Sequence, residues 1–326
     1  MAGRTGGPWV SARRGVGRPA AIVAVAALPW TWFLLRDVPG PLTDLAAILL
    51  PLSAGGVVVA GVLVAVGRPR ARVPALAGAL STLLVGTVAV VGPWLPADAG
   101  QVVAADGLVV AGANVDGQGG PLEALRPIDA DLWVVPELSE KVRQEFAATY
   151  PHHLVGTAGA PRVGVFSRYP LRLLEGAGAN LPGERIEVAG PAGPFVLYAL
   201  HIPRPWVLGD TVDGYQVSVA EHQRLAEVVA ARVSAETLPV VVVGDLNSTD
   251  RGRDYRALTR GAGLVDAMRD TVGMPTSVGK WRFLLARIDH VLLSPGWCGD
   301  DAHRVPLPGS SHRAVAATVG PCAVGP

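Results

Sequence analysis

The chain has 326 residues, of which half are hydrophobic and only 17% are charged. A water-soluble domain usually has about a quarter charged residues, so this composition disfavours a wholly soluble protein and predicts a membrane portion. The part that follows position 100 contains 20 basic and 24 acidic residues, a net charge of −4. This excludes the overall basic character of proteins that bind nucleic acid without sequence preference, although a local basic patch stays open.

Three stretches in the N-terminal third contain no charged residue. They are Pro19–Leu35, Leu45–Gly67 and Val73–Ala97. A helix that crosses the hydrocarbon core needs ~20 apolar residues, a length that the second and third reach and the first approaches. Buried core helices are the alternative, but three successive runs without an amphipathic period disfavour it. We therefore expect three transmembrane helices within a membrane anchor at residues 19–97.

Basic residues are concentrated on one side of these spans, which predicts their orientation. They lie before the first span and between the second and third, at Arg4, Arg13, Arg14, Arg18, Arg68, Arg70 and Arg72. The positive-inside rule places both groups in the cytoplasm. Residues 1–18 are thus expected to form a cytoplasmic N-terminus, and the part after the third span is expected outside the cytoplasm. The spans hold no ionisable residue, which disfavours a transporter.

From residue 102 to 320, short apolar runs rich in β-branched residues alternate with polar and Gly/Pro-rich turns, ahead of a tail at 321–326. Interspersed strands and helices favour an α/β layered sheet sandwich with a site along one rim. Cys298 and Cys322 either pair in an oxidising compartment or stay as two free thiols. The expected strands are Leu108–Asn114, Leu132–Pro136, Gly164–Phe166, Phe195–His201, Val240–Asp245, Ile288–Leu293 and Ala314–Val319, and the expected helices are Ser139–Ala148 and Val219–Val233.

The first two strands end in polar residues. Asn114 and Asp116 follow the first in the sequence Ala-Asn-Val-Asp-Gly, and Glu137 follows the second in Leu-Trp-Val-Val-Pro-Glu-Leu. A carboxylate at such a position is a hard oxygen ligand of the kind that Mg²⁺ prefers. Taken singly, the first pattern is more typical of a hairpin or loop. The second pattern is also that of a glutamate that begins a helix.

Two further strands also end in polar residues. His201 closes the run Tyr-Ala-Leu-His, and Val-Val-Val-Gly-Asp-Leu-Asn-Ser runs into Asp245 and Asn247. Strand alternation predicts that Asp245 and Asn247 point the same way while Leu246 packs inward. A carboxylate and an amide that converge in this way suit a phosphate, a water molecule and a divalent metal. An Asx-rich turn and an ordinary loop histidine are the alternatives.

The last two strands begin next to an Asp and a His. Asp289 stands in Arg-Ile-Asp-His-Val-Leu-Leu-Ser, and His312 directly precedes the final strand in Ser-Ser-His-Arg-Ala-Val. An Asp that orients a His, which in turn assists attack by water, is a common acid–base pairing. The sequence predicts this pairing if the fold brings the two strands together.

Taken in order, these motifs resemble the endonuclease/exonuclease/phosphatase superfamily. Its members include abasic-site endonucleases, secreted deoxyribonucleases, sphingomyelinases and inositol-polyphosphate phosphatases. The resemblance spans nearly the whole region after residue 102, and the segment Ser-Arg-Tyr-Pro-Leu at 167–171 adds to it. It implies a four-layered α/β sandwich with two packed mixed sheets, and the hydrolysis of phosphoesters.

The resemblance implies a role for each catalytic candidate. His201 is expected to donate to phosphate oxygens as charge builds, and Asp245 to position or activate the attacking water. Asn247 is expected to bind the phosphate. His312, oriented by Asp289, is expected to be the second catalytic histidine, either as a base or as a phosphate-binding acid.

The resemblance also implies a divalent metal, Mg²⁺ or Mn²⁺, held by Glu137 with Asn114 and Asp116 beside it. The chain departs from the family at one position, because Ser311 stands where an Asp usually precedes the final His. That Asp is commonly close to the metal. A one-metal site centred on Glu137 is therefore favoured over a two-metal site.

Three spans followed by an outward-facing site resemble the membrane-anchored actinomycete members of this superfamily, one of which is linked to teicoplanin resistance. The expected substrate is a lipid-linked phosphoester such as undecaprenyl pyrophosphate, and the expected partner is the lipid bilayer. One alternative is an anchored extracellular nuclease, which the acidic domain disfavours. Another is a degenerate, noncatalytic binding module, for which Ser311 is the only support.

Overall fold

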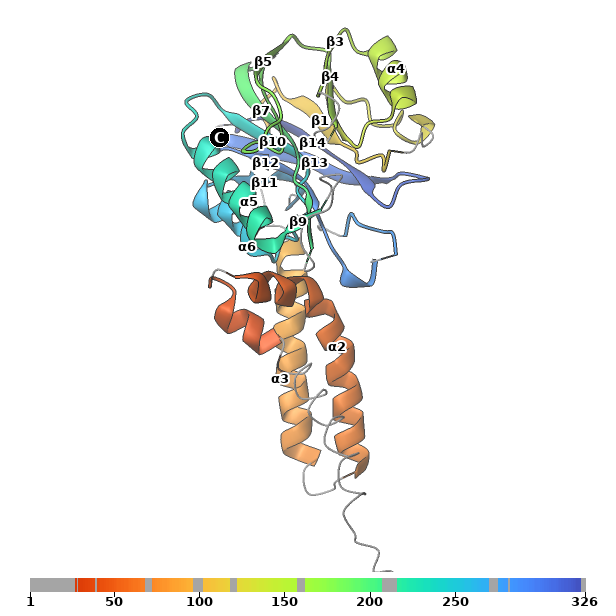
Figure 1. The fold of residues 1–326 in the computed structure, drawn as a ribbon, viewed down its shortest axis with the longest axis vertical. Helices are drawn as coiled ribbons and strands as arrows, with labels where there is room; N and C mark the ends of the chain where they lie inside the picture. Colours follow the sequence, from red (N-terminus) through yellow and green to blue (C-terminus); the bar gives the residue numbers. More distant parts are fainter. Residues whose placement is uncertain are drawn as a thin grey trace, which may run out of the picture.

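The computed structural model describes most of the chain, and the statements below concern these residues. They are 27, 29–38, 40–67, 72–95, 102–117, 122–156, 162–206, 216–269, 275–280 and 282–323. An apolar helical segment, residues 27 to 95, precedes a sheet domain, residues 102 to 323. The sheet domain stands at one end of the helices (Figure 1).

The sheet domain contains two six-stranded sheets, with the strand orders β13-β14-β1-β2-β4-β3 and β11-β12-β10-β7-β6-β5. Both sheets are mixed, because β1 is parallel to β2 and β10 to β7 while other neighbours are antiparallel. The first sheet comprises β1 Leu108–Gly112, β2 Leu132–Pro136, β3 His152–Val155, β4 Val163–Ser167, β13 Trp297–Pro306 and β14 Arg313–Pro321. The second comprises β5 Leu171–Glu175, β6 Gly183–Gly190, β7 Gly193–His201, β10 Val240–Asp245, β11 Val265–Asp266 and β12 Asp289–Leu293.

The two sheets pack face to face, and helices cover their outer faces. Fully buried valines such as Val110, Val134 and Val243 fill the space between the sheets, and each such side chain contributes about 1.5–3 kcal/mol. Helix α4 (Glu140–Thr149) packs on the first sheet and α5 (Val219–Ser234) on the second. The predicted α/β sandwich of two packed mixed sheets is confirmed.

The short elements are η2 Gly92–Trp94, η3 Leu122–Ala124, β8 Arg204–Trp206, β9 Gln216–Ser218, α6 Arg253–Arg256, η4 Ala257–Gly261, η5 Ala267–Arg269 and η6 Arg282–Leu284.

Two glycines allow the strands beside β7 to approach its end closely. Gly183 of β6 has a φ of +147° and Gly244 of β10 a φ of +142°, values that residues with a Cβ rarely adopt. A Cβ at Gly183 would lie 2.0 Å from the carbonyl oxygen of Ala199, and one at Gly244 1.9 Å from that of Leu200. These close contacts hold the final residue of β7 tightly between its neighbours.

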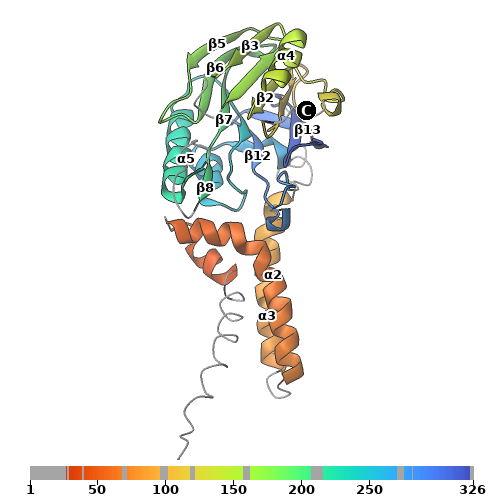
Figure 2. The same cartoon turned by 45° about the vertical axis from the view of Figure 1, so that its right-hand side comes forward.

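The helical segment consists mainly of α2 (Pro41–Gly67) and α3 (Arg72–Val91). Helix α2 bends by 56° between Leu42–Ser53 and Gly55–Leu63. Its first half lies across the underside of the sheet domain, and its second half runs beside α3 (Figure 2). Residues 29–35 are also helical and pack on α3, where the Trp30 indole donates to the Thr82 hydroxyl at 3.2 Å.

The predicted spans are helical where the structure describes them, but they differ in shape from the prediction. Within the described residues one helix, Leu76–Trp94, is long and apolar enough to cross a membrane, and the bent pair could form a second. The predicted span Leu45–Gly67 is therefore bent, not straight. Most of Pro19–Leu35 lies outside the described residues, so the number of spans stays a prediction.

Pro51 lies in the first half of α2, shortly before the bend. Proline has no N–H and removes the hydrogen bond to the carbonyl four residues earlier, which here is that of Ala47. The buried guanidinium of Arg251 supplies the missing donor, with its Nε 2.6 Å from the Ala47 oxygen. The same guanidinium donates to the carbonyls of Leu284 and Leu285 at 2.7 and 3.1 Å. One arginine thus joins the loop after β10 to the helical segment.

Cys298 and Cys322 form a disulfide that links the beginning of β13 to the residue after β14. Of the two alternatives that the sequence left open, the structure has the bonded one.

Candidate active site

Strand register brings three of the predicted residues into one row. In the second sheet β10 pairs in parallel with β7 and antiparallel with β12, so that Asp245 is opposite His201 on one side and Asp289 on the other. The first sheet contributes residues from the ends of β1 and β2 and from the start of β14. All of these strand ends meet at one rim of the sandwich, as the sequence predicted.

Three residues at this rim have a left-handed backbone. Asp116, Glu137 and Asn247 have φ angles of 55°, 51° and 46°. Such values are uncommon for residues with a Cβ, and they concentrate at functional sites where the surrounding structure holds them. The sharp turns direct the side chains back over the strand ends.

Asn114 holds two carboxylates together at the base of the site. Its amide nitrogen donates to Glu137 Oε1 at 3.1 Å and to Asp245 Oδ2 at 2.9 Å. Its amide oxygen accepts from the backbone N–H of Asp116 at 2.9 Å. In this arrangement Asn114 links the carboxylates, and its oxygen faces the backbone.

His312 and Asp289 form the expected pair. His312 Nδ1 lies 3.0 Å from Asp289 Oδ2, and His312 Nε2 lies 3.8 Å from Asp245 Oδ2. Burial lowers the pKa of His312, but the carboxylates of Asp289, Asp245 and Asp116 outweigh this effect and raise the pKa to about 10. The imidazole is thus fixed by one carboxylate and turned towards another.

His201 lies on the opposite side of Asp245. Its Nε2 is 3.6 Å from Glu137 Oε1 and 3.8 Å from Asp245 Oδ2. Burial lowers the pKa of His201 more than the nearby Asp245 raises it, so the neutral imidazole is favoured. The two histidines therefore differ in their preferred charge and face one carboxylate from two sides.

Asn247 reaches the site by a route that strand alternation did not predict. The strand ends at Asp245, and Asn247 returns in an Asx turn in which its N–H donates to Asp245 Oδ1 at 2.9 Å. Its side-chain amide donates to the Ile202 carbonyl at 2.9 Å, directly after His201. An Asx turn therefore places Asn247 beside the strand ends. This turn is the alternative that the sequence left open for the motif.

The site also suits a divalent cation. Burial, together with the charges of Asp245 and Asp116, raises the pKa of Glu137 although Asn114 donates to it. Burial likewise raises the pKa of Asp245. Several carboxylates confined in one place are costly unless a cation compensates their charge. Asp245, Asp289 and His312 also offer ligand atoms within 4.8 Å of one another, but His312 and Asp289 are already bonded to each other, so the Glu137 side fits a cation better.

The structure adds supporting residues that sequence reasoning missed. The Thr276 hydroxyl accepts from the backbone N–H groups of Ile288 and Asp289 at 3.0 and 3.1 Å. The Ser310 hydroxyl donates to the Asn114 carbonyl at 2.8 Å and accepts from the His312 N–H at 3.0 Å. The Ser-Ser-His sequence was a signal for Ser310, whereas nothing in the sequence pointed to Thr276.

Ser311 stands at the departure from the family pattern, and its backbone is part of the site. The Ser311 N–H donates to Asp116 Oδ2 at 2.8 Å. This bond fixes Asp116, and it does not depend on the side chain at position 311. All eight candidates, Asn114, Asp116, Glu137, His201, Asp245, Asn247, Asp289 and His312, thus belong to one connected cluster.

The chain is similar to known proteins at the level of family and fold. The Endonuclease/Exonuclease/phosphatase family profile matches residues 111–312. A family protein from Beutenbergia cavernae has 17% identity and a TM-score of 0.50, with 66% of this chain and 72% of that chain covered. A second, from Bacteroides vulgatus, has 14% identity and a TM-score of 0.49, with 66% and 99% covered.

A mannosyl-6-phosphatase from Bacteroides thetaiotaomicron has 16% identity and a TM-score of 0.46, with 65% of this chain and 99% of that chain covered. No curated protein sequence is similar enough to count as a match. The family profile covers more than half of the chain, and its ends fall on the strand before Asn114 and on His312. The chain therefore belongs to the endonuclease/exonuclease/phosphatase family, and its sheet domain has the hydrolase fold of that family.

Proposed function

We propose that the chain is a membrane-anchored hydrolase that cleaves a lipid-linked phosphoester outside the cytoplasm. In this proposal residues 19–97 form the anchor and residues 102–320 the catalytic domain. The observation that carries it is the position of the site, whose loops lie on the side of the domain that faces the apolar helices. Arg251, six residues after Asp245, donates to a carbonyl of α2.

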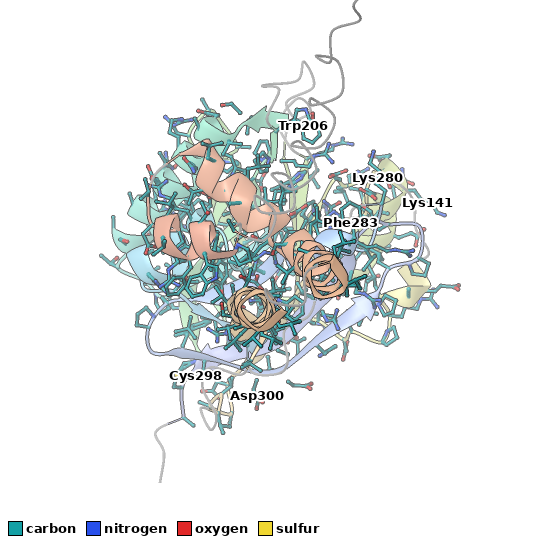
Figure 3. The ribbon with its side chains drawn as sticks, turned by 90° about the horizontal axis from the view of Figure 1, so that it is seen from below. Lys141, Trp206, Lys280, Phe283, Cys298 and Asp300 are labelled. Atoms are coloured by element: carbon teal, nitrogen blue, oxygen red, sulfur yellow. A yellow bond between two sulfur atoms is a disulfide. The ribbon has the colours of Figure 1, made fainter. Side chains whose placement is uncertain are left out.

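Two exposed aromatic side chains near the site support a lipid substrate. Trp206 of β8 follows His201 by five residues, and Phe283 of η6 precedes Asp289 by six; they are 36% and 46% exposed. Figure 3 shows both on the face seen along the helices, together with Lys280. Exposed aromatic rings favour the membrane interface, so this face is suited to a phosphate that is held at a bilayer surface.

In the proposed mechanism each residue around the phosphorus atom has a separate role. Asp245 accepts the proton of the attacking water, since its carboxylate is central and held by Asn114. The water oxygen bonds to phosphorus while the bond from phosphorus to the leaving oxygen breaks. His312, fixed by Asp289 through Nδ1, donates a proton from Nε2 to that leaving oxygen. His201 and Asn247 bind the remaining oxygens as negative charge builds.

Glu137, with Asp116 near it, is the proposed holder of a Mg²⁺ or Mn²⁺ ion. When bound, such an ion neutralises phosphate charge and polarises the phosphorus–oxygen bond. Asn114 keeps the Glu137 carboxylate in place through its amide nitrogen. Ser311 leaves this arrangement intact, because the hydrogen bond to Asp116 comes from its backbone N–H.

The test is hydrolysis by detergent-solubilised full-length protein with Mg²⁺. Undecaprenyl pyrophosphate, a phospholipid and DNA are offered side by side. Asp245→Asn and His312→Asn are compared with Asp106→Asn and His303→Asn, which remove the same groups at exposed positions. We expect turnover of the lipid-linked pyrophosphate, abolished only by the first two changes.

The other outcomes separate the alternatives. Cleavage of DNA alone would make the chain an anchored nuclease. Turnover that survives both site changes would remove the assigned roles. No turnover of any substrate, with correctly folded protein, would favour a noncatalytic binding module.

A further inference from the structure

A cavity of about 670 Å³ lies between the helical segment and the sheet domain. We call it the junction cavity. Helix 29–35 and the last two turns of α3 form one wall, and the α6–η4 segment with β11 forms the other. None of the eight candidate active-site residues lines it. It is therefore a separate feature of the chain.

Cationic groups gather where the end of helix 29–35 meets the sheet domain, and Arg256 donates there to the Arg36 carbonyl. Arg36, Arg256, Arg260 and Arg269 all line it. Arg260 is exposed and makes no ion pair within the described residues. Arg269 donates to the backbone carbonyl of Leu95, at 3.1 and 3.3 Å, and not to a carboxylate.

The acidic groups nearby do not neutralise this charge. Asp250 and Asp266, which also line the cavity, are both bound by the buried Arg287 at 3.0 and 2.7 Å. Asp37 is shared by Arg36 and Arg256, and its side chain is 70% exposed. The cavity therefore keeps an excess of positive charge, and guanidinium groups bind phosphate well.

The helical side of the junction cavity is apolar and exposed. Phe33, Leu84 and Val88 line it and are 45%, 64% and 61% exposed. Leu84 and Val88 are four residues apart on α3 and so share one face of the helix. A hydrocarbon chain lying along this face would cover apolar surface that is otherwise left open.

We propose that the junction cavity binds one anionic phospholipid, with its phosphate between Arg260 and Arg269 and an acyl chain along Leu84 and Val88. The apolar and cationic ends are in the right order, because Leu84 and Val88 lie in the last two turns of α3 and Arg269 binds the Leu95 carbonyl beyond the end of that helix. The proposal rests on the membrane insertion of α3 proposed above and not on catalysis. The bound lipid joins the helices to the domain.

The test is lipid binding by the full-length protein, measured by native mass spectrometry from detergent. Phosphatidylglycerol and phosphatidylcholine with identical acyl chains are titrated separately. We expect a one-to-one adduct with phosphatidylglycerol. The affinity for phosphatidylcholine should be lower by at least roughly tenfold. The double variant Arg260→Gln/Arg269→Gln should lose the preference. Arg253→Gln is the matched control, since Arg253 pairs with Glu227 outside the cavity.

A second variant probes the apolar end and guards against misfolding. Leu84→Trp fills the acyl position while all arginines stay, and it should weaken the adduct with the unfolding midpoint preserved. Equal binding of the two lipids, or a preference untouched by both variants, would overturn the proposal. Displacement of the lipid by millimolar inorganic phosphate would show an anion site without lipid character and would overturn it too. Because turnover is not the readout, failure here leaves the proposed catalytic function standing.

Discussion

Two histidines at the rim of the sandwich, His312 and His201, favour opposite charge states although both lie close to Asp245. Asp289 stabilises the charged form of His312, whereas burial favours the neutral form of His201. Asp245 lies between them, 3.8 Å from each. Two groups of one chemical type whose environments separate their pKa values are typical of acid–base sites.

Asp289→Asn tests the pairing directly. Loss of the carboxylate charge should leave His312 without a fixed orientation and lower kcat on the order of 10²-fold, with KM little changed. Steady-state kinetics of phosphate release measures this, with Asp129→Asn, at an exposed ion pair, as the control. A double variant Asp289→Asn/His312→Asn should be little worse than either change alone; additive losses would show that the two residues act separately.

Glu184 gives a pH-dependent prediction. It is 4% exposed, its Oε2 has no hydrogen-bond partner among the described residues, and burial raises its pKa from 4.5 to about 7. The folded protein thus holds this proton more tightly than the unfolded chain, so stability falls as the pH rises from 4.5 to about 7 and stays lower above it. The shift in pKa corresponds to a change of about 3 kcal/mol at most in the free energy of unfolding.

Glu184→Gln cannot ionise, so its unfolding midpoint should exceed that of the unchanged protein more at pH 8 than at pH 5. Thermal unfolding at both pH values is the measurement. Glu187→Gln, on the same strand but paired with Arg172, is the control. An equal gain at both pH values would show that Glu184 is already ionised in the folded protein.

At the scale of elements, Arg251 connects a strand-end loop with a helix. Its guanidinium replaces the donor that Pro51 cannot supply to Ala47. Arg251→Gln should lower the free energy of unfolding by about 3 kcal/mol, because buried carbonyls lose a charged donor. In a Pro51→Ala background the N–H returns to α2, so the same change should cost about 1 kcal/mol less.

A double-mutant cycle on thermal unfolding measures this coupling. Arg253→Gln, two residues away and paired with Glu227, should show no coupling to Pro51. A coupling energy near zero for Arg251 would mean that the guanidinium does not serve the proline-freed carbonyl.

The elements that the sequence predicted best are those with continuous β-branched runs. Leu132–Pro136 and Val240–Asp245 were predicted with their observed bounds. Strand β13, Trp-Cys-Gly-Asp-Asp-Ala-His-Arg-Val-Pro, was missed because it lies at a sheet edge, where exposed polar residues break the alternation. An irregularity of α2 near Pro51 could be suspected from the sequence. The contact of the Ala47 carbonyl with Arg251 depends on tertiary structure.

The site residues were predictable because each motif lies at a strand end. The arrangement of hydrogen bonds around these residues could not be predicted from the sequence. The Asn114 amide, with its nitrogen towards two carboxylates, and the Asx turn at Asn247 follow from backbone angles that no local pattern specifies. The predicted metal ligands remain untested predictions.

At the scale of the whole molecule, the proposed function requires a metal ion and a membrane. A cation bound only by the folded site stabilises it, by about 2.7 kcal/mol at a hundredfold excess over Kd. Mg²⁺ or Mn²⁺ should therefore raise the unfolding midpoint, and chelation should abolish turnover. Glu137→Gln should lose most of the shift, while Glu123→Gln should keep it; an equal shift in both would place the cation elsewhere.

The orientation is testable by labelling intact cells. Asp106→Cys adds a thiol at an exposed position just after the helical segment. We expect a membrane-impermeant maleimide to label it without lysis, since the positive-inside rule places it outside. Protection in intact cells, with labelling after lysis, would reverse the orientation.

The hydrogen bonds of Arg251 have a consequence for the kinetics. They tie the loop after Asp245 to the carbonyls of Ala47 and Ile48 in α2, so the site cannot swing freely on a tether. With α3 inserted as proposed, the site stays at a fixed height and searches a two-dimensional surface. Its rate should then follow the mole fraction of substrate within the lipid layer and fall when inert lipid is added at constant total substrate, which is the behaviour called surface dilution.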